Sequence, residues 1–366
     1  MGATMTDVLI FFTGLAALGI GAELLVRGAS RLALSIGISP LVVGLTIVAM
    51  GTSAPEMAVS VDAALSGSVD VAVGNVVGSN IFNVLFILGS SALIVPLTVH
   101  AQIVRQEVPI MIAATLLFVV MALDGRISFG EAALLLAALI AYTVFLIVQS
   151  RRESRETIGE FAGEMPPSAS WNKHWSVQAL AVLGGLALLV VGADLLVDAA
   201  TSFARAMGVS DLVIGLTIVA AGTSLPEVAA SLTAALRGER DIAVGNVVGS
   251  NVFNILGCLG LAGVAAPGGL VVAAELLRVD IWVLLAVMLT CIPIFAYRHE
   301  ISRWQGGILL LDYVNYTAWL VLHTQQHPLL ARFLDIAVFG IIPVTLLLLL
   351  LMWLKRRPIS TTFPKK

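Results

Sequence analysis

The chain has 366 residues, of which 59% are hydrophobic and only 12% charged, and its mean hydropathy is +1.01. A soluble domain carries about 25% charged residues, so an ordinary soluble enzyme is excluded. The net charge of −3 says little about partners, because the distribution of charge matters more than its sum, and no nucleic-acid partner is expected. Apolar runs of about 20 residues, each long enough to cross a membrane, recur along the whole length. The composition therefore predicts an all-α polytopic membrane protein surrounded by lipid.

Taken in chain order, eleven apolar runs are expected to span the membrane. The first has no basic segment before it and no clear cleavage site after it, so it is expected to be a retained helix and not a signal peptide. The expected spans are 7–26, 38–65, 69–95, 107–123, 130–149, 176–204, 209–236, 241–265, 279–297, 304–322 and 333–354.

A polar stretch divides these spans into two sets of five, with one left over. The expected organisation is a first repeat (1–150), a short cytoplasmic linker (151–175), a second repeat (176–325), and an eleventh helix with a basic tail (326–366). The eleventh helix falls outside the five-plus-five pattern. We expect it to be an accessory helix or a contact between copies in a homo-oligomer.

The distribution of lysine and arginine predicts the orientation, because cytoplasmic loops are enriched in both. With the N-terminus outside and the C-terminus inside, only four of the 20 basic residues fall in outer segments. These four are Arg126, Arg205, Arg278 and Arg332. Since five is an odd number, the second set of spans enters the membrane from the opposite side, and the two repeats are expected to be inverted.

The chain contains one long motif twice. Residues 44–89 and 215–260 align without a gap, and 32 of the 46 aligned positions are identical. Glu56 and Glu227 occupy equivalent positions within otherwise apolar sequence. A duplicated hydrophobic hairpin with one carboxylate in each copy is typical of a transporter whose site lies between inverted repeats.

Each glutamate follows a sequence that disturbs a helix. The two copies read Gly-Thr-Ser-Ala-Pro-Glu (51–56) and Gly-Thr-Ser-Leu-Pro-Glu (222–227). Proline lacks an N–H group and clashes with the preceding turn, so carbonyl oxygens near Ala49 and Ala220 are expected to be freed. Hydroxyl groups add further oxygen ligands, and they belong to Thr52, Ser53, Thr223 and Ser224.

The second half of each hairpin carries a polar stripe. Asn75, Ser79 and Asn83 are spaced by four residues and share one helix face. Their counterparts are Asn246, Ser250 and Asn254. We expect each stripe to face the segment that carries the glutamate.

All these candidate ligands are oxygen atoms, and no histidine or thiolate joins them. Oxygen ligands select hard cations such as Ca²⁺, Mg²⁺ or Na⁺ over zinc or copper. Two carboxylates balance the charge of one divalent ion, and a flexible set of six to eight oxygens suits Ca²⁺ better than Mg²⁺.

Other polar residues in the spans have weaker signals. Glu23 and Asp194 are repeat-related and are expected near opposite membrane faces in interfacial structural roles. Asp62 has Thr233 as its counterpart, so symmetry does not favour it as a central ligand, although a role at the entry stays open. Asp312 is expected to be a paired structural carboxylate.

The paired segments GTSAPE…GNVVGSNIFN and GTSLPE…GNVVGSNVFN closely resemble the alpha repeats of sodium/calcium exchangers, within the calcium/cation antiporter superfamily. The resemblance covers about residues 7 to 322, and the short linker resembles the prokaryotic members. It implies a ten-helix exchanger core that moves Ca²⁺ and Na⁺, with no other cofactor, in a bacterial inner membrane. It also implies that the first and sixth spans slide across the core.

The resemblance implies a role for each matching residue. Glu56 and Glu227 would be the central Ca²⁺ ligands, shared with Na⁺, and Thr52 and Thr223 would add an oxygen each. The flanking Na⁺ sites would use Ser53, Ser79, Ser224 and Ser250, with the backbone carbonyls of Ala49 and Ala220. Asn83 and Asn254 would lie beside the central site. Some relatives, potassium-dependent exchangers among them, have aspartate at the position of Asn254, so asparagine there argues against potassium dependence.

Three other functions stay open to test. A proton/calcium antiporter would need the same carboxylates, but the neighbouring hydroxyls favour Na⁺. A channel usually has its filter on an oligomer axis, whereas this chain contains both halves of the site. An intramembrane enzyme is not favoured, because the sequence shows no pairing of a nucleophile with a base. Cys258 and Cys291 lie in apolar runs as packing residues, and the five histidines lie near span ends or in loops.

Overall fold

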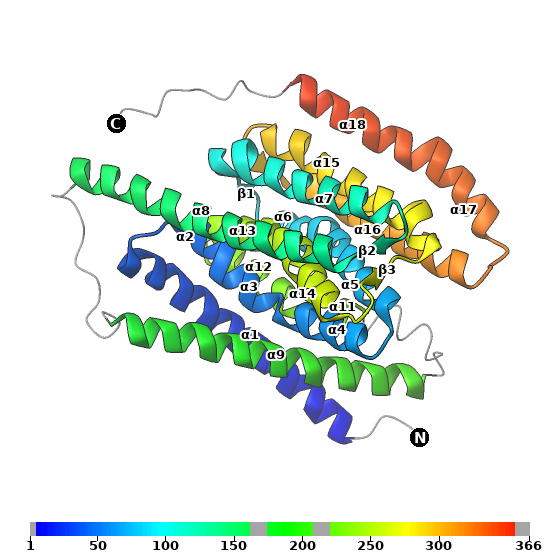
Figure 1. Cartoon of the computed structure of the whole chain (residues 1–366), viewed down its shortest axis with the longest axis horizontal. Helices are drawn as coiled ribbons and strands as arrows, with labels where there is room; N and C mark the ends of the chain where they lie inside the picture. Colours follow the sequence, from blue (N-terminus) through cyan, green and yellow to red (C-terminus); the bar gives the residue numbers. More distant parts are fainter. Residues whose placement is uncertain (1–4, 162–173, 208–219, 356–366) are drawn as a thin grey trace.

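The computed structural model describes residues 5–161, 174–207 and 220–355, and it is almost entirely helical (Figure 1). Within these ranges, eight helices are long and apolar enough to cross a membrane, and the bent pair Pro40–Thr52 and Ala54–Leu65 makes a ninth. The helix Arg303–Thr324 has 22 residues and matches the expected tenth span. The expected span 209–236 begins outside the described residues, which contain its last part. The predicted all-α polytopic fold is confirmed.

The first half of the chain contains the following elements. They are α1 (Met5–Ile36), α2 (Pro40–Val43), η1 (Gly44–Val48), α3 (Ala49–Thr52), α4 (Ala54–Leu65), α5 (Val69–Phe82), η2 (Asn83–Leu88), α6 (Gly89–Ile94), β1 (Leu97–Thr98), η3 (Ile103–Glu107), α7 (Val108–Ala122), β2 (Arg126–Ile127) and α8 (Phe129–Phe161). Segments labelled η are π-helical turns, in which the hydrogen bond spans five residues and not four.

The second half repeats this order as far as it is described. Its elements are α9 (Trp175–Ala206), α11 (Ala220–Gly222), α12 (Leu225–Leu236), α13 (Arg240–Val252), η5 (Phe253–Cys258), α14 (Leu259–Ala265), β3 (Leu270–Val271), η6 (Leu276–Asp280), α15 (Ile281–Ala296), β4 (Glu300–Ile301) and α16 (Arg303–Thr324). The expected eleventh span is α17 (Leu330–Ile336), η7 (Ala337–Ile341) and α18 (Ile342–Leu354).

Two helices are longer than their apolar runs predict. α1 continues ten residues past the expected end at 26, because Glu23 pairs with Arg27 one turn later and the polar end stays helical. α8 continues to Phe161, into the segment expected to be a linker. Hydropathy marks only the apolar part of a helix. Charged residues with good helix propensity can extend the helix beyond its apolar part.

Two short antiparallel ladders join the halves of the chain. β1 pairs with β4, and β2 pairs with β3. The first ladder joins segments that follow the third and ninth expected spans, and the second joins segments that follow the fourth and eighth. The third and eighth spans carry the same repeated motif, yet they end at different ladders, on opposite sides. This is the arrangement of inverted repeats.

The first helices of the two halves cross each other at glycines, and Figure 1 shows α1 and α9 side by side. A Cβ atom added to Gly14 would lie 2.9 Å from the carbonyl oxygen of Gly192. One added to Gly21 would lie 2.8 Å from the carbonyl oxygen of Gly185. Backbones approach this closely only where small residues permit it. α18 lies on the opposite side of the bundle (Figure 1), and most of its side chains are exposed.

Candidate ion-binding site

The helix that carries each glutamate is broken one turn before it, as the Gly, Ser and Pro pattern predicts. The chain leaves α3 at Ser53 (φ −79°, ψ 5°) and bends by 44° into α4. Ser224 has nearly the same conformation before α12 (φ −90°, ψ 6°). Proline then occupies the first turn, where its missing N–H costs nothing. Glu56 and Glu227 lie in these first turns, where the helix dipole favours negative charge.

The two repeats exchange hydrogen bonds across the site. The hydroxyl of Ser53 donates to Oε1 of Glu227 over 3.0 Å, and the hydroxyl of Ser224 donates to Oε1 of Glu56 over 2.8 Å. Both carboxylates are fully buried, with 0% of their surface exposed. The sequence placed these four residues in two separate motifs, and the fold brings them together at one point.

Neither carboxylate forms an ion pair with a basic side chain in the described part of the chain. The described residues also contain no group of three His, Cys, Asp or Glu side chains that could hold a metal. Buried charges without a counter-charge are costly inside a membrane. A cation between the carboxylates would supply that counter-charge, with hydroxyl, amide and carbonyl oxygens as its other ligands.

Several buried polar atoms beside the carboxylates have no hydrogen-bond partner among the described residues. They are Oε2 of Glu56 and of Glu227, Oγ of Ser79 and of Ser250, Oγ1 of Thr223, both amide atoms of Asn83, and Nδ2 of Asn254. Such atoms cost about 1–3 kcal/mol each unless something satisfies them. Their oxygen atoms are the ligands expected of a site for hard cations.

The two asparagines lie where the α-helix changes to a π-helix. Asn83 begins η2, directly after α5, and Asn254 is the second residue of η5, after α13. π-Turns of this kind are frequent at functional sites, because the extra residue turns a side chain away from the regular helix face. Sequence periodicity does not reveal them. The Asn254 amide oxygen accepts a hydrogen bond from the thiol of Cys258, so this cysteine supports a candidate ligand and does more than fill space.

The expectation of freed carbonyls needs a correction at Ala49. Its carbonyl oxygen accepts the Ser53 N–H over 3.0 Å and lies 3.4 Å from the hydroxyl of Thr52. The helix before the break therefore keeps its last hydrogen bond, because proline comes two residues later. Ala220 begins α11, and the contacts of its side chain lie outside the described part of the chain.

One side of the site is closely packed. The hydroxyl of Thr52 lies 3.2 Å from Oδ1 of Asn246, and a Cβ added to Gly249 would lie 2.7 Å from the Cβ of Ala49.

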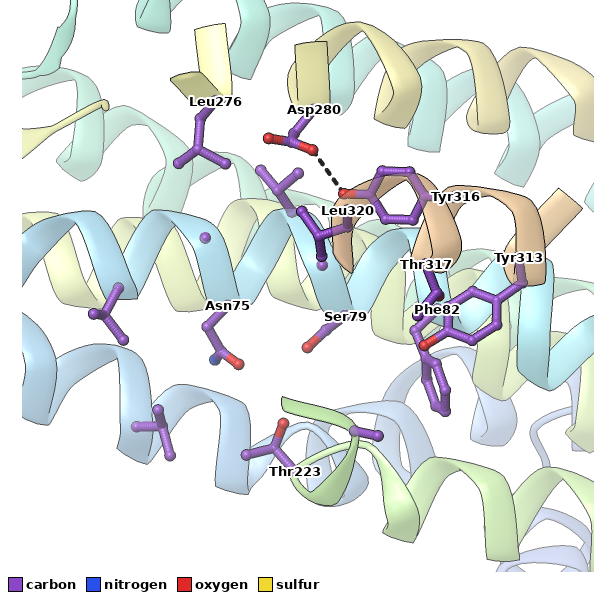
Figure 2. Close-up of a pocket in the computed structure, with 16 residues that line it drawn as sticks. Asn75, Ser79, Phe82, Thr223, Leu276, Asp280, Tyr313, Tyr316, Thr317 and Leu320 are labelled. Atoms are coloured by element: carbon purple, nitrogen blue, oxygen red, sulfur yellow. Dashed lines mark hydrogen bonds between the residues drawn. The ribbon is translucent and has the colours of Figure 1, made fainter. Parts of the chain in front are cut away.

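A cavity of about 500 Å³ borders the site. Figure 2 shows Asn75, Ser79 and Thr223 along it, with Asp280 and Tyr316 on the other side of the α5 ribbon. The cavity thus connects three polar residues of the repeats with a carboxylate that does not belong to the repeated motif.

The sequence reasoning missed this carboxylate and its counterpart. Asp280 ends η6 and accepts a 2.7 Å hydrogen bond from the hydroxyl of Tyr316. Glu107 ends η3 and accepts a 2.8 Å hydrogen bond from Tyr142. The pairs are repeat-related, but a two-residue insertion before η6 breaks the constant offset that aligns the motifs. The sequence signal was the shared spacing Arg105-Gln-Glu and Arg278-Val-Asp.

The other polar residues have the following surroundings. Glu23 forms ion pairs with Arg27 and Arg237 near a helix end, and Asp194 is exposed. Asp62 is exposed and lines a shallow pocket that shares Val59 and Val71 with the 500 Å³ cavity. The carboxylate of Asp312 accepts a 3.3 Å hydrogen bond from Thr345 of α18, so it is paired with the eleventh helix.

Comparison with known proteins identifies the family. The family model described as "Sodium/calcium exchanger protein" matches residues 6–148 and 177–322. The inner membrane protein YrbG of Escherichia coli (strain K12) is 33% identical over 324 residues, which cover 88% of this chain and 98% of YrbG. The sodium/calcium exchanger MaX1 of Methanosarcina acetivorans is 34% identical over 344 residues, which cover 85% and 97%.

Among solved structures, the sodium-calcium exchanger NCX_Mj superimposes with a TM-score of 0.73 at 32% sequence identity, covering 86% of this chain and 98% of NCX_Mj. The fold, the inverted repeats and the family model agree. The chain is an integral membrane protein that belongs to the sodium/calcium exchanger family.

Proposed function

We propose that this protein exchanges Na⁺ for Ca²⁺ across the membrane, with the ions bound between Glu56 and Glu227. One observation carries the proposal. Two fully buried carboxylates face each other's serines without a basic partner in the described chain, among buried oxygens that have no hydrogen-bond partner there. Membership of the exchanger family supports the same reading.

The central site takes Ca²⁺ through Glu56 and Glu227, with Thr52 and Thr223 as neighbouring oxygen ligands. Two carboxylates balance the ion's double charge. Each carboxylate already uses one oxygen to accept a serine hydrogen bond, which leaves Oε2 of both residues for the ion. The amides of Asn83 and Asn254 lie beside this site at the two π-turns.

Na⁺ uses the same carboxylates together with flanking sites. Ser53, Ser79, Ser224 and Ser250 form these flanking sites. The backbone carbonyls of Ala49 and Ala220 supply a further oxygen each, and that of Ala49 does so while it also accepts the Ser53 N–H. Because Na⁺ and Ca²⁺ share the charged ligands, they compete for the site and do not bind together.

Alternating access is the transport cycle that a site between two inverted repeats supports. The cavity beside Asn75 and Thr223 provides access from one face, and the close contact of Gly249 with Ala49 closes the other. We propose that α1 and α9 slide together across the core along their glycine contacts and exchange the open and closed sides. The change of access is easy when cations neutralise the carboxylates and costly when the site is empty and charged. The two fluxes are therefore coupled.

We further propose that the N-terminus lies outside and the C-terminus inside a bacterial inner membrane. The bias of lysine and arginine supports this orientation. Residues 1–150 and 176–325 then form the two inverted functional units. The cavity lies at the end of α5 that follows the loop at Gly67, which this topology places outside.

Uptake of radioactive Ca²⁺ into proteoliposomes loaded with Na⁺ and diluted into Na⁺-free medium tests the proposal. We expect uptake in the wild type, and none in Glu56→Gln or Glu227→Gln. Asp312→Asn is the matched control, since it removes an intramembrane carboxylate that contacts α18 and not the site. Uptake driven equally by a pH gradient without Na⁺ would instead indicate proton/calcium exchange, and no coupled uptake by folded protein would rule out calcium transport.

A further inference from the structure

The cavity contains one carboxylate that the duplicated motif does not supply. Asp280 lies at the end of η6, has 9% of its surface exposed, and lines the 500 Å³ cavity. The same cavity is lined by Asn75, Ser79 and Thr223. Asp280 and side chains of the proposed ion site therefore line the same cavity, and α5 runs between them in Figure 2.

The surroundings of Asp280 leave part of its carboxylate available. In the described chain, Tyr316 donates one hydrogen bond to Oδ1. The residue also lines the cavity, so its carboxylate lies at the cavity wall.

The repeat-related carboxylate has different surroundings. Glu107 is fully buried, and it accepts hydrogen bonds from Tyr142 (2.8 Å), Gln102 (2.9 Å) and Gln106 (2.7 Å). Protein donors thus satisfy both of its oxygens. Asp280, at the same position of the other repeat, lines a cavity instead.

We propose that Asp280 is a cation-attracting entry residue for the face on which the cavity opens, where it concentrates Ca²⁺ and Na⁺ before they reach the buried glutamates. Tyr316 positions its carboxylate. This inference rests on the proposed function, because it assigns a further residue to the same cation route. A fixed negative charge in a narrow cavity with apolar walls raises the local concentration of cations and the rate at which they bind. Val59, Val71 and Leu276 are among the walls of this cavity.

The charge and the hydrogen bond can be removed separately. Asp280→Asn keeps an oxygen that can accept the Tyr316 hydrogen bond but removes the charge. Tyr316→Phe removes the hydrogen bond and keeps the charge. Asp312→Asn is the control. It removes a half-buried carboxylate from the helix that carries Tyr316, and this carboxylate does not line the cavity.

Sodium-driven Ca²⁺ uptake in vesicles of known orientation tests the inference. In Asp280→Asn, we expect kcat/KM for Ca²⁺ presented at the cavity face to fall about tenfold, with a nearly unchanged kcat at saturating Ca²⁺. The wild-type kcat/KM should decrease as an inert salt is added, because salt screens exposed charges, and the mutant should lose most of this dependence. Tyr316→Phe should have a smaller effect than Asp280→Asn, and Asp312→Asn should match the wild type.

The possible failures are distinguishable. If the wild type shows no Na⁺-dependent Ca²⁺ flux, the proposed function itself fails. If the wild type is active and Asp280→Asn has a normal kcat/KM, the proposed function stands and the entry role is wrong. A third outcome is a loss of kcat/KM that is equal from both faces, insensitive to salt and as large in Tyr316→Phe as in Asp280→Asn. It would show that the hydrogen bond between Asp280 and Tyr316 only holds two helices together.

Discussion

The hydroxyl of Ser53 donates a 3.0 Å hydrogen bond to Oε1 of Glu227, so a residue of one repeat holds the carboxylate of the other. Ser224 and Glu56 form the reciprocal contact over 2.8 Å. Each serine also lies at the break before its own glutamate, where its backbone turns the chain. Each serine therefore shapes the helix break of its own repeat and holds the carboxylate of the other repeat.

Replacing either serine with alanine should weaken Ca²⁺ binding without abolishing exchange. A hydrogen bond to a charged group contributes about 1.5–3 kcal/mol, so a loss of about tenfold or more in apparent Ca²⁺ affinity is expected for Ser53→Ala and for Ser224→Ala. Concentration dependence of Na⁺-driven Ca²⁺ uptake measures it. Ser66→Ala is a control, since that residue is exposed and its hydroxyl donates to the carbonyl of Ala63 at the end of the same helix. Wild-type affinity in both site variants would show that the serines do not act on the carboxylates.

The glycine contacts between α1 and α9 predict a defect in turnover. A Cβ added to Gly185 would lie 2.6 Å from the backbone nitrogen of Leu25, whereas the described residues place nothing within 4 Å of one added to its neighbour Gly184. Gly185→Ala should therefore disturb the crossing and Gly184→Ala should not. Overpacking of this kind costs about 1–3 kcal/mol, which corresponds to a fall in turnover of about tenfold.

Ca²⁺ binding should remain close to normal in both glycine variants, because neither residue touches the ion site. The rate of Na⁺-driven Ca²⁺ uptake at saturating Ca²⁺ measures turnover, and thermal unfolding in detergent checks that the variants are folded. Equal turnover in Gly184→Ala and Gly185→Ala would contradict sliding along these contacts.

Much of this site could be predicted from the sequence, because duplication marks the important residues twice. The pairing of Glu56 with Glu227 and the break beside each one follow from residue type and spacing. The exchange of serine partners could not be predicted, because it depends on how two distant hairpins face each other. The π-turns at Asn83 and Asn254 also left no periodic signal, since they add one residue to a helix that stays apolar.

The entry carboxylate was missed for a different reason. Asp280 and Glu107 lie in apolar helices, and an insertion of two residues hides their equivalence from an alignment at constant offset. The structure restores it, because both residues end a π-turn and both accept a tyrosine hydroxyl. Helix lengths were also underestimated where charged turns extend an apolar helix, as at the end of α1.

Asn254→Asp should change the charge balance of transport. Asn254 is fully buried beside the site, and its Oδ1 already accepts from Cys258. A third carboxylate would leave the site at −1 with Ca²⁺ bound, and this charge is costly to move through the low-dielectric midpoint. We expect slower Ca²⁺ uptake that external K⁺ partly restores by supplying one more positive charge. Uptake with and without K⁺ measures this, and an unchanged rate in K⁺-free medium would show that Asn254 does not face the ion.

Removing the eleventh helix should preserve exchange and reduce stability. α17 and α18 supply none of the site residues, and their contacts with the core include Thr345 with Asp312 and Met352 with Gln305. A chain that ends after Gln326 would expose the face of α15 and α16 that α18 covers. We therefore expect normal Na⁺-driven Ca²⁺ uptake per folded molecule and a lower unfolding temperature in detergent. Size-exclusion chromatography with light scattering would show in the same samples whether this helix also joins two copies. Loss of transport by folded, truncated protein would instead assign the helix to the ion-exchange mechanism.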